Sequence, residues 1–255
     1  MIKTQAEIDT IAQGGKLLSQ ILDEILAAAK TGVTTKELDR IAEKRILEVG
    51  GLPAFKGYRD RSEDQPFPTT ICASVNEQLV HTPANDYALK TGDMLTVDIG
   101  MRYPAKDGYF TDMAKTIVLG EPSALAKKLM SVTRIALEKG IAAARAGNYV
   151  ADIGKAIQPY VEANGFSVVR SLVGHGVGYA VHEEPRVPNY LNPKLPNVQL
   201  EAGMVIAIEP MVNAGSYEIT TLDDGWSIAA ADGQLCAHFE HTVAITEDGP
   251  RILTQ

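Results

Sequence analysis

The chain has little of several residue types whose abundance would point to particular classes of protein. Only two of its 255 residues are cysteines, Cys72 and Cys236, and they lie far apart and outside any zinc-finger spacing. We therefore expect neither a disulfide framework nor a thiolate metal site. Lysine and arginine together number 24 against 32 acidic residues, and the net charge is −8. This balance disfavours broad binding to nucleic acid or to anionic membranes.

The chain also lacks an apolar run long enough to cross a membrane, and its first residues include acids and glutamines where a secretory signal needs an unbroken apolar stretch. We therefore expect a soluble protein of the cytoplasm. No linker or low-complexity segment divides the sequence. With 45% hydrophobic and 22% charged residues, the chain can bury one large core, and we expect a single domain over residues 1–255.

Apolar residues at helical spacing predict four helices, at about residues 5–29, from Thr34 or Thr35 to the glycines at 50 and 51, at 123–146 and at about 150–164. Sliding the chain on itself so that Gly32 meets Gly147 also places Leu38 on Ile153. Two amphipathic helices can match by chance. Because strand-like sequence follows each helix pair, we favour a duplicated unit of two helices plus a sheet, with halves at about 5–120 and 121–250.

Two predicted strands carry aspartates. Residues 94–99 alternate, which places Asp98 opposite the aliphatic face, and residues 109–119 place Asp112 on one face of the next strand. The proline and glycine between them predict a hairpin, so the two aspartates can meet across neighbouring strands. A further antiparallel pair is predicted over 226–245 around Asp232 and Gly233, with Glu240 on its second strand. Residues 182–199 hold four prolines and are predicted to form an ordered loop.

Two glutamates stand in apolar sequence, Glu209 in MVIAIEPMV and Glu240 in HFEHTVAI. Burying an ionised carboxylate there costs several kcal/mol without a positive partner. An arginine could be that partner for Glu209 alone. Asp98 and Asp112 pose the same problem, however, and few lysines or arginines occur in the same runs. Divalent cations would neutralise all four carboxylates together, and a site of this kind indicates a hydrolytic reaction.

The five histidines divide by their surroundings. His175 lies between two glycines, where another group can approach closely, and is favoured as a metal ligand. His81 and His182 suit donors to a substrate or a tetrahedral intermediate. His238 and His241 flank Glu240, and we assign them to the opposite strand face as structural residues. Carboxylates with one imidazole suit Mn, Fe, Co or Zn, and bridging carboxylates admit two ions about 3.5 Å apart.

The segments ICASVNEQLVH, TVDIG, YFTDMAKTIVLG, GHGVGYAVHEEP, IEPMV and DDGWSIAAADGQLCAHFEHTVAIT together resemble the type I methionine aminopeptidases over nearly the whole chain. The resemblance implies an α+β pita-bread fold, in which pseudo-two-fold halves pack helices on a curved antiparallel sheet. It implies two divalent cations bridged by Asp112 and Glu240, with His81 and His182 contacting the substrate near the scissile amide and Glu209 assisting proton transfer. The implied metal ligands are Asp98, Asp112, His175, Glu209 and Glu240.

By the same resemblance, the substrate is a free peptide or nascent-chain N-terminus whose methionine is released. Phe67, Cys72 and Trp226 match the family's methionine pocket, although ordinary core packing explains Phe67 and Cys72 equally well. The implied partners are peptides and nascent chains, with the ribosome as a transient contact and neither DNA nor membrane. We expect a monomer.

The chain departs from that family at four places. Thr82 stands where a glycine is usual, and Val181 stands where an aromatic residue is common. Residues 58–65 resemble a charged insertion, and Asp98 and Asp112 are 14 positions apart, which is longer than is common. Loops tolerate such insertions, so these departures bear on peptide preference more than on chemistry. Two rival functions remain, a proline-specific peptidase of the same fold, such as prolidase or aminopeptidase P, and a non-catalytic binding protein. The segments around Cys72 and Trp226 and the complete ligand set argue against them.

Overall fold

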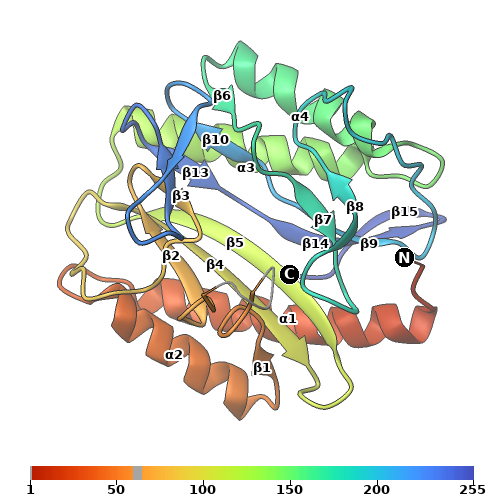
Figure 1. The fold of residues 1–255 in the computed structure, drawn as a ribbon, viewed down its shortest axis with the longest axis horizontal. Coiled ribbons are helices and arrows are strands. Elements are labelled where there is room, and N and C mark those ends of the chain that lie inside the picture. Colours follow the sequence, from red (N-terminus) through yellow and green to blue (C-terminus); the bar gives the residue numbers. More distant parts are fainter. Residues whose placement is uncertain (1, 60–64) are drawn as a thin grey trace.

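The computed structural model describes residues 2–59 and 65–255. Figure 1 shows two helix pairs on opposite sides of the molecule with strands between them. The first pair is α1 (Gln5–Ala28) and α2 (Thr35–Glu48), and the second is α3 (Ala124–Ala143) and α4 (Val150–Ala163). The four predicted helices are confirmed to within three residues at each end. No helix in the described residues is both long and apolar enough to cross a lipid bilayer.

The helix ends follow from local chemistry. The side chain of Thr34 accepts a hydrogen bond from the backbone of Glu37, whose own side chain returns to the Thr34 backbone, a capping box that fixes the start of α2. Gly32 and Gly147, the residues that align in the sequence repeat, precede α2 and α4 with nearly equal φ values of 91° and 89°. This shared conformation supports the proposed duplication, which itself stays a prediction.

Each helix pair has its own core. Leu18, Leu22 and Leu38 belong to a buried cluster under α1 and α2, and Ile153 and Ile157 belong to another under α3 and α4. The apolar stripes read from the sequence are therefore the faces that pack inward. Because α1 contacts β4 and β5 while α3 contacts β10 and β13, each pair covers strands of its own half.

The strands of the first half are β1 (Leu52–Pro53), β2 (Ile71–Val75), β3 (Gln78–Val80), β4 (Met94–Tyr103) and β5 (Tyr109–Val118). Those of the second half are β6 (Ser167–Val168), β7 (Gly174–Gly176), β8 (Glu183–Val187), β9 (Val205–Ile208), β10 (Met211–Asn213), β11 (Ile219–Thr221), β12 (Ile228–Ala230), β13 (Cys236–His238), β14 (His241–Thr246) and β15 (Gly249–Ile252). Strand β4 pairs with β1, β2 and β5, and the largest sheet has the order β15-β14-β9-β7-β8.

The halves meet where β5 lies against the segment around Glu240. The Asp112 backbone N–H donates to Thr242 Oγ1 at 3.2 Å, and the Glu240 N–H donates to the Ala114 carbonyl at 3.0 Å. Thr116 Oγ1 donates to the His238 carbonyl at 2.8 Å. These bonds bring the strand that carries Asp112 against the segment that carries Glu240, and Figure 1 shows β5 and β14 next to each other between the two helix pairs.

Two strand predictions are wrong. The turn at Asp232 and Gly233 exists, but the strands around it do not pair with each other: β12 pairs with β11 and β3, and β13 pairs with β10. Glu240 lies in the two-residue gap between β13 and β14 rather than on a strand. The segment 182–199 is also not wholly irregular, because β8 forms at the edge of the five-stranded sheet, a position where a proline such as Pro185 is tolerated.

Candidate metal centre and adjoining pocket

Asp98 and Asp112 come from the β4–β5 hairpin. The register pairs Asp98 with Ala114 and Gly100 with Asp112, so the two carboxylates leave the same face from neighbouring strands. Both are buried, and the negative charge of Asp112 is, after burial, a cause of the raised pKa of Asp98. The predicted meeting of the two aspartates is confirmed.

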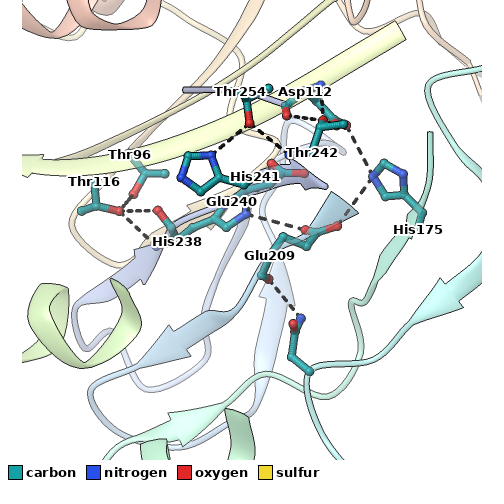
Figure 2. A network of polar contacts seen from close by, with 11 residues as sticks. Thr96, Asp112, Thr116, His175, Glu209, His238, Glu240, His241, Thr242 and Thr254 are labelled. Atoms are coloured by element: carbon teal, nitrogen blue, oxygen red, sulfur yellow. Dashed lines mark hydrogen bonds and ion pairs between the residues drawn. The ribbon is translucent and has the colours of Figure 1, made fainter. Parts of the chain in front are cut away.

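Three residues of the second half reach the same place. His175 is the middle residue of β7, Glu209 follows β9, and Glu240 precedes β14. Figure 2 shows His175 beside Asp112 and Glu209: its Nε2 lies 3.5 Å from Asp112 Oδ2 and 3.7 Å from Glu209 Oε1. One ligand atom each from Asp112, His175 and Glu240 lie within 4.8 Å of one another, a group that could hold a metal ion.

The glycines beside His175 have the role that the sequence suggested. A Cβ atom added to Gly174 would lie 2.4 Å from the Ala207 carbonyl oxygen, and one added to Gly176 would lie 2.3 Å from that of Glu184. Only glycine therefore lets the neighbouring strands approach β7. His175 Nδ1 lies 2.9 Å from the Gly176 carbonyl oxygen, an acceptor that holds the ring proton on Nδ1 and leaves the Nε2 lone pair toward the carboxylates.

Burial without cationic partners dominates the electrostatics of this centre. Burial raises the pKa of Asp98, Glu209 and Glu240 well above the ordinary range, and nearby carboxylates raise these pKa values further. Burial also raises the pKa of Asp112, to about 6. Within residues 2–59 and 65–255, the ion pairs of these carboxylates involve only His175 and His238, with no lysine or arginine.

This chemistry fits divalent cations. Asp98 Oδ1 is buried without a hydrogen-bond partner among the described residues, as expected of an oxygen that binds a cation. Oxygen donors with one bare imidazole nitrogen match the preferences of Mn, Fe, Co and Zn. The proposed arginine partner for Glu209 is not present in the described part of the chain.

The interpretation of His238 as facing away is wrong. Its Nε2 lies 3.6 Å from Glu209 Oε2 and 3.8 Å from Glu240 Oε2, and the side chain is buried at 1% exposure. Residues two apart on an extended chain share a face, so His238 points to the side of Glu240. His241 differs, because its Nδ1 lies 2.9 Å from Thr254 Oγ1 and ties β14 to the C-terminal segment.

A cavity of about 140 Å³ opens beside the carboxylates. A water molecule occupies about 30 Å³ in the liquid, so the cavity has room for a side chain. Its lining includes all three predicted pocket residues, Phe67, Cys72 and Trp226. The rings of Phe67 and Trp226 meet edge to face, with centroids 5.3 Å apart, and Cys72 is a buried free thiol. Phe67 and Cys72 are buried in the core as well as lining the cavity, whereas Trp226 is only partly buried.

The sequence interpretation missed Phe55, Tyr58 and Val80, which also line this cavity. Tyr58 is the most informative of the three. Its hydroxyl lies 2.7 Å from His182 Nδ1, and the two rings meet at nearly a right angle. An aromatic residue at the start of the charged segment 58–65 was the only signal in the sequence. Most of that predicted insertion, residues 60–64, lies outside the described residues.

The two histidines that the sequence predicts to contact the substrate flank the centre. The His182 ring lies edge to face with the His175 ring, at 4.4 Å between centroids. His81 lines the cavity and has a φ of 58°, a conformation that a residue other than glycine adopts at some cost and that is frequent at functional sites. The neighbouring departures Thr82 and Val181 are both buried, and neither belongs to the cavity lining given by the described residues.

Comparison with known proteins agrees with this geometry. A family model described as Metallopeptidase family M24 matches residues 9–247. A methionine aminopeptidase of Clostridium perfringens is 47% identical, over 100% of this chain and 98% of its own length. Methionine aminopeptidase 1 of Bacillus subtilis is 46% identical, over 99% and 98%.

Solved structures support the fold. A crystal structure of methionine aminopeptidase from Thermotoga maritima superposes with a TM-score of 0.92 at 39% identity, covering 100% of this chain and 99% of that one. Prolidase from Pyrococcus furiosus reaches a TM-score of 0.80 at 23% identity, with 65% of its chain covered, which shows a shared fold alone. The expected α+β pita-bread fold is confirmed. The chain belongs to metallopeptidase family M24, and its sequence groups with the methionine aminopeptidases of that family.

Proposed function

We propose that this enzyme removes N-terminal methionine from peptides and nascent proteins, using two divalent cations. The observation that carries the proposal is the cluster of four buried carboxylates, which has no lysine or arginine partner in the described residues and opens into the cavity of Phe67, Cys72 and Trp226. Asp98, Asp112, His175, Glu209 and Glu240 would hold these cations.

Such cations lower the pKa of a coordinated water to about 7 and polarise a carbonyl. The side chains of this protein do the rest. His81 and His182 donate hydrogen bonds to the carbonyl of the scissile amide and to the oxyanion that develops there. Tyr58, bonded to His182 Nδ1, orients that imidazole. Glu209 carries a proton toward the departing amine, a role suited to a carboxyl group whose pKa burial has raised.

Selection of methionine follows from the cavity. An unbranched thioether fits irregular apolar spaces and makes favourable contacts with the edges of aromatic rings. Phe67 and Trp226 offer two rings at right angles, and the buried thiol of Cys72 adds a soft, weakly polar contact. The acidic centre beside this cavity attracts a free α-amino group, which restricts the enzyme to chain ends.

The proposal extends to the setting of the enzyme. We propose a monomeric cytoplasmic enzyme, with residues 1–255 as one catalytic domain, that meets new chains during transient contact with the ribosome. The chain covers 98% of its Clostridium relative, which supports one catalytic domain. The cytoplasmic setting follows from the proposed substrate, the N-terminus of a newly made chain.

The test uses protein stripped with a chelator and reloaded in turn with Mn²⁺, Fe²⁺, Co²⁺ and Zn²⁺. Each form is offered Met-Ala-Ser, Ala-Pro-Ala and N-acetyl-Met-Ala-Ser, and released amino acids are measured by mass spectrometry. We expect methionine from the first peptide alone. Cleavage of Ala-Pro-Ala in preference would indicate a proline-specific peptidase, and silence with every metal would indicate a binding protein. Calorimetric titration should count two cations per chain.

A further inference from the structure

His238 is the buried imidazole that the proposed mechanism leaves without a role. Its side chain is 1% exposed, and neither ring nitrogen has a hydrogen-bond partner within the described residues. Its backbone is fixed on both sides by Thr116, whose Oγ1 accepts from the His238 N–H at 3.0 Å and donates to its carbonyl at 2.8 Å. Buried polar groups without partners are rare, and one held in place so firmly calls for an explanation.

The ring faces the proposed metal ligands. His238 Nε2 lies 3.6 Å from Glu209 Oε2, while His175 Nε2 lies 3.7 Å from Glu209 Oε1. The Glu209 carboxylate therefore stands between two imidazoles, one at each oxygen, as Figure 2 shows. A distance of 3.6 Å is a few tenths of an ångström too long for a hydrogen bond, so a bond between these two atoms would require them to approach by that amount.

The two imidazoles differ in which ring nitrogen carries the proton. Gly176 offers His175 Nδ1 an acceptor, so the Nε2 lone pair of His175 is free to bind a cation. His238 Nδ1 has no acceptor among the described residues, whereas its Nε2 faces the carboxylates of Glu209 and Glu240. The negative charge opposite Nε2 favours the tautomer with the proton there. His238 thus presents a donor where His175 presents an acceptor.

We propose that His238 is a positioning residue for the metal centre, donating from Nε2 to Glu209 Oε2 so that Oε1 is held toward the cation beside His175. The proposal rests on the cation site proposed above. Carboxylates that bind metals commonly accept such a bond on their second oxygen, and losing it costs about 10–100-fold in metal affinity.

The test compares the parent with three variants. His238→Leu removes the hydrogen-bond donor and keeps a side chain of similar size, and His238→Gln keeps an N–H donor. His241→Gln is the matched control, because His241 lies on the other side of Glu240 and its imidazole faces Thr254. Mn²⁺ dissociation constants are measured by titration calorimetry. We expect His238→Leu to bind Mn²⁺ about 10–100-fold more weakly, His238→Gln to recover to within about threefold because its amide also donates, and His241→Gln to match the parent.

Thermal unfolding in EDTA separates positioning from packing. Without metal, His238→Leu replaces two unpartnered nitrogens with an apolar group, so its melting temperature should equal or exceed that of the parent. A lower melting temperature with unchanged Mn²⁺ affinity would show a packing role and overturn the proposal. A changed visible spectrum of the Co²⁺ form in His238→Gln would place the imidazole on the metal and overturn it as well. A parent that binds no Mn²⁺ overturns the cation site itself.

Discussion

The substitution Glu240→Gln should make the metal-free protein more stable. In the metal-loaded enzyme, the same substitution should abolish activity. Glu240 is 3% exposed, and burial, followed by the charges of Asp112, Glu209 and Asp98, raises its pKa well above 4.5. In the unfolded chain the same carboxyl group ionises freely near pH 4.5. Folding at neutral pH therefore either buries a charge among like charges or takes up a proton. Glutamine avoids both costs.

The magnitude has a ceiling set by protonation. Keeping a carboxyl group protonated at pH 7 when its unfolded pKa is 4.5 costs at most about 3 kcal/mol, from 1.36 kcal/mol for each pH unit. For a chain of 255 residues, about 3 kcal/mol corresponds to a rise of about 6 °C in melting temperature. The sign follows from the raised pKa: the parent has its full stability below the unfolded pKa and loses it as the pH rises through the folded pKa. The gap between variant and parent should shrink to below about 0.5 kcal/mol at pH 4.5.

The assay is differential scanning calorimetry in EDTA at pH 4.5 and pH 7, with Glu247→Gln as the control because it makes the same change at an exposed position. With saturating Mn²⁺ the order should reverse, since the proposed cations would stabilise the parent, whereas the variant lacks one of the proposed ligands. Turnover should fall by more than about a hundredfold, the upper end for loss of contacts around a metal. Equal melting temperatures in EDTA at pH 7, or a gain that persists at pH 4.5, would refute the reasoning.

Two further substitutions test other parts of the site, and a third tests the ion pair between Lys3 and Glu183. Tyr58→Phe removes the hydroxyl bonded to His182 Nδ1 and should lower kcat/KM about 10-fold, the equivalent of about 1.4 kcal/mol; unchanged kinetics would remove Tyr58 from the mechanism. Trp226→Ala should lower kcat/KM for Met-Ala-Ser about 10–100-fold by removing about 1.5–3 kcal/mol of apolar contact, with Mn²⁺ affinity unchanged in calorimetry. Lys3→Met removes the ammonium 2.8 Å from the partly buried Glu183 carboxylate, which keeps hydrogen bonds from the Tyr179 and Ala180 backbone N–H groups. It should destabilise the protein by about 1.5–3 kcal/mol in urea unfolding; a loss below about 1 kcal/mol would contradict this view of the pair.

Local signals predicted the helices well because a helix is a local structure. The N-cap at Thr34 and the spacing of Leu38 and its neighbours involve residues within a few turns, and the structure has α2 at Thr35–Glu48. The β4–β5 hairpin was predicted for the same reason, since its two strands are separated by a short loop. Strand alternation and one hairpin loop were therefore enough to place Asp98 and Asp112 on one face.

Strand pairing over longer distances could not be read in this way. Asp232 and Gly233 do form a turn, but a turn does not determine which strands pair. Strand β13 pairs with β10, and β12 pairs with β3. The contact of Tyr58 with His182 joins residues 124 positions apart, and no sequence pattern in either segment predicts this contact. His238 was different: alternation alone places it on the side of Glu240, so its position was available in the sequence.

The metal centre could be inferred from the sequence because four carboxylates stand in apolar segments with few lysines or arginines nearby. Its location, in contrast, depends on the whole fold. Two of its carboxylates, Asp98 and Asp112, belong to the first half, and Glu209 and Glu240 belong to the second, with the hydrogen bond from Glu240 to Ala114 crossing between them. The like charges therefore repel across the contact between the halves. A cation that binds only this assembled state stabilises it by mass action. We therefore expect a cation held by the residues proposed for catalysis to strengthen the contact between the two halves.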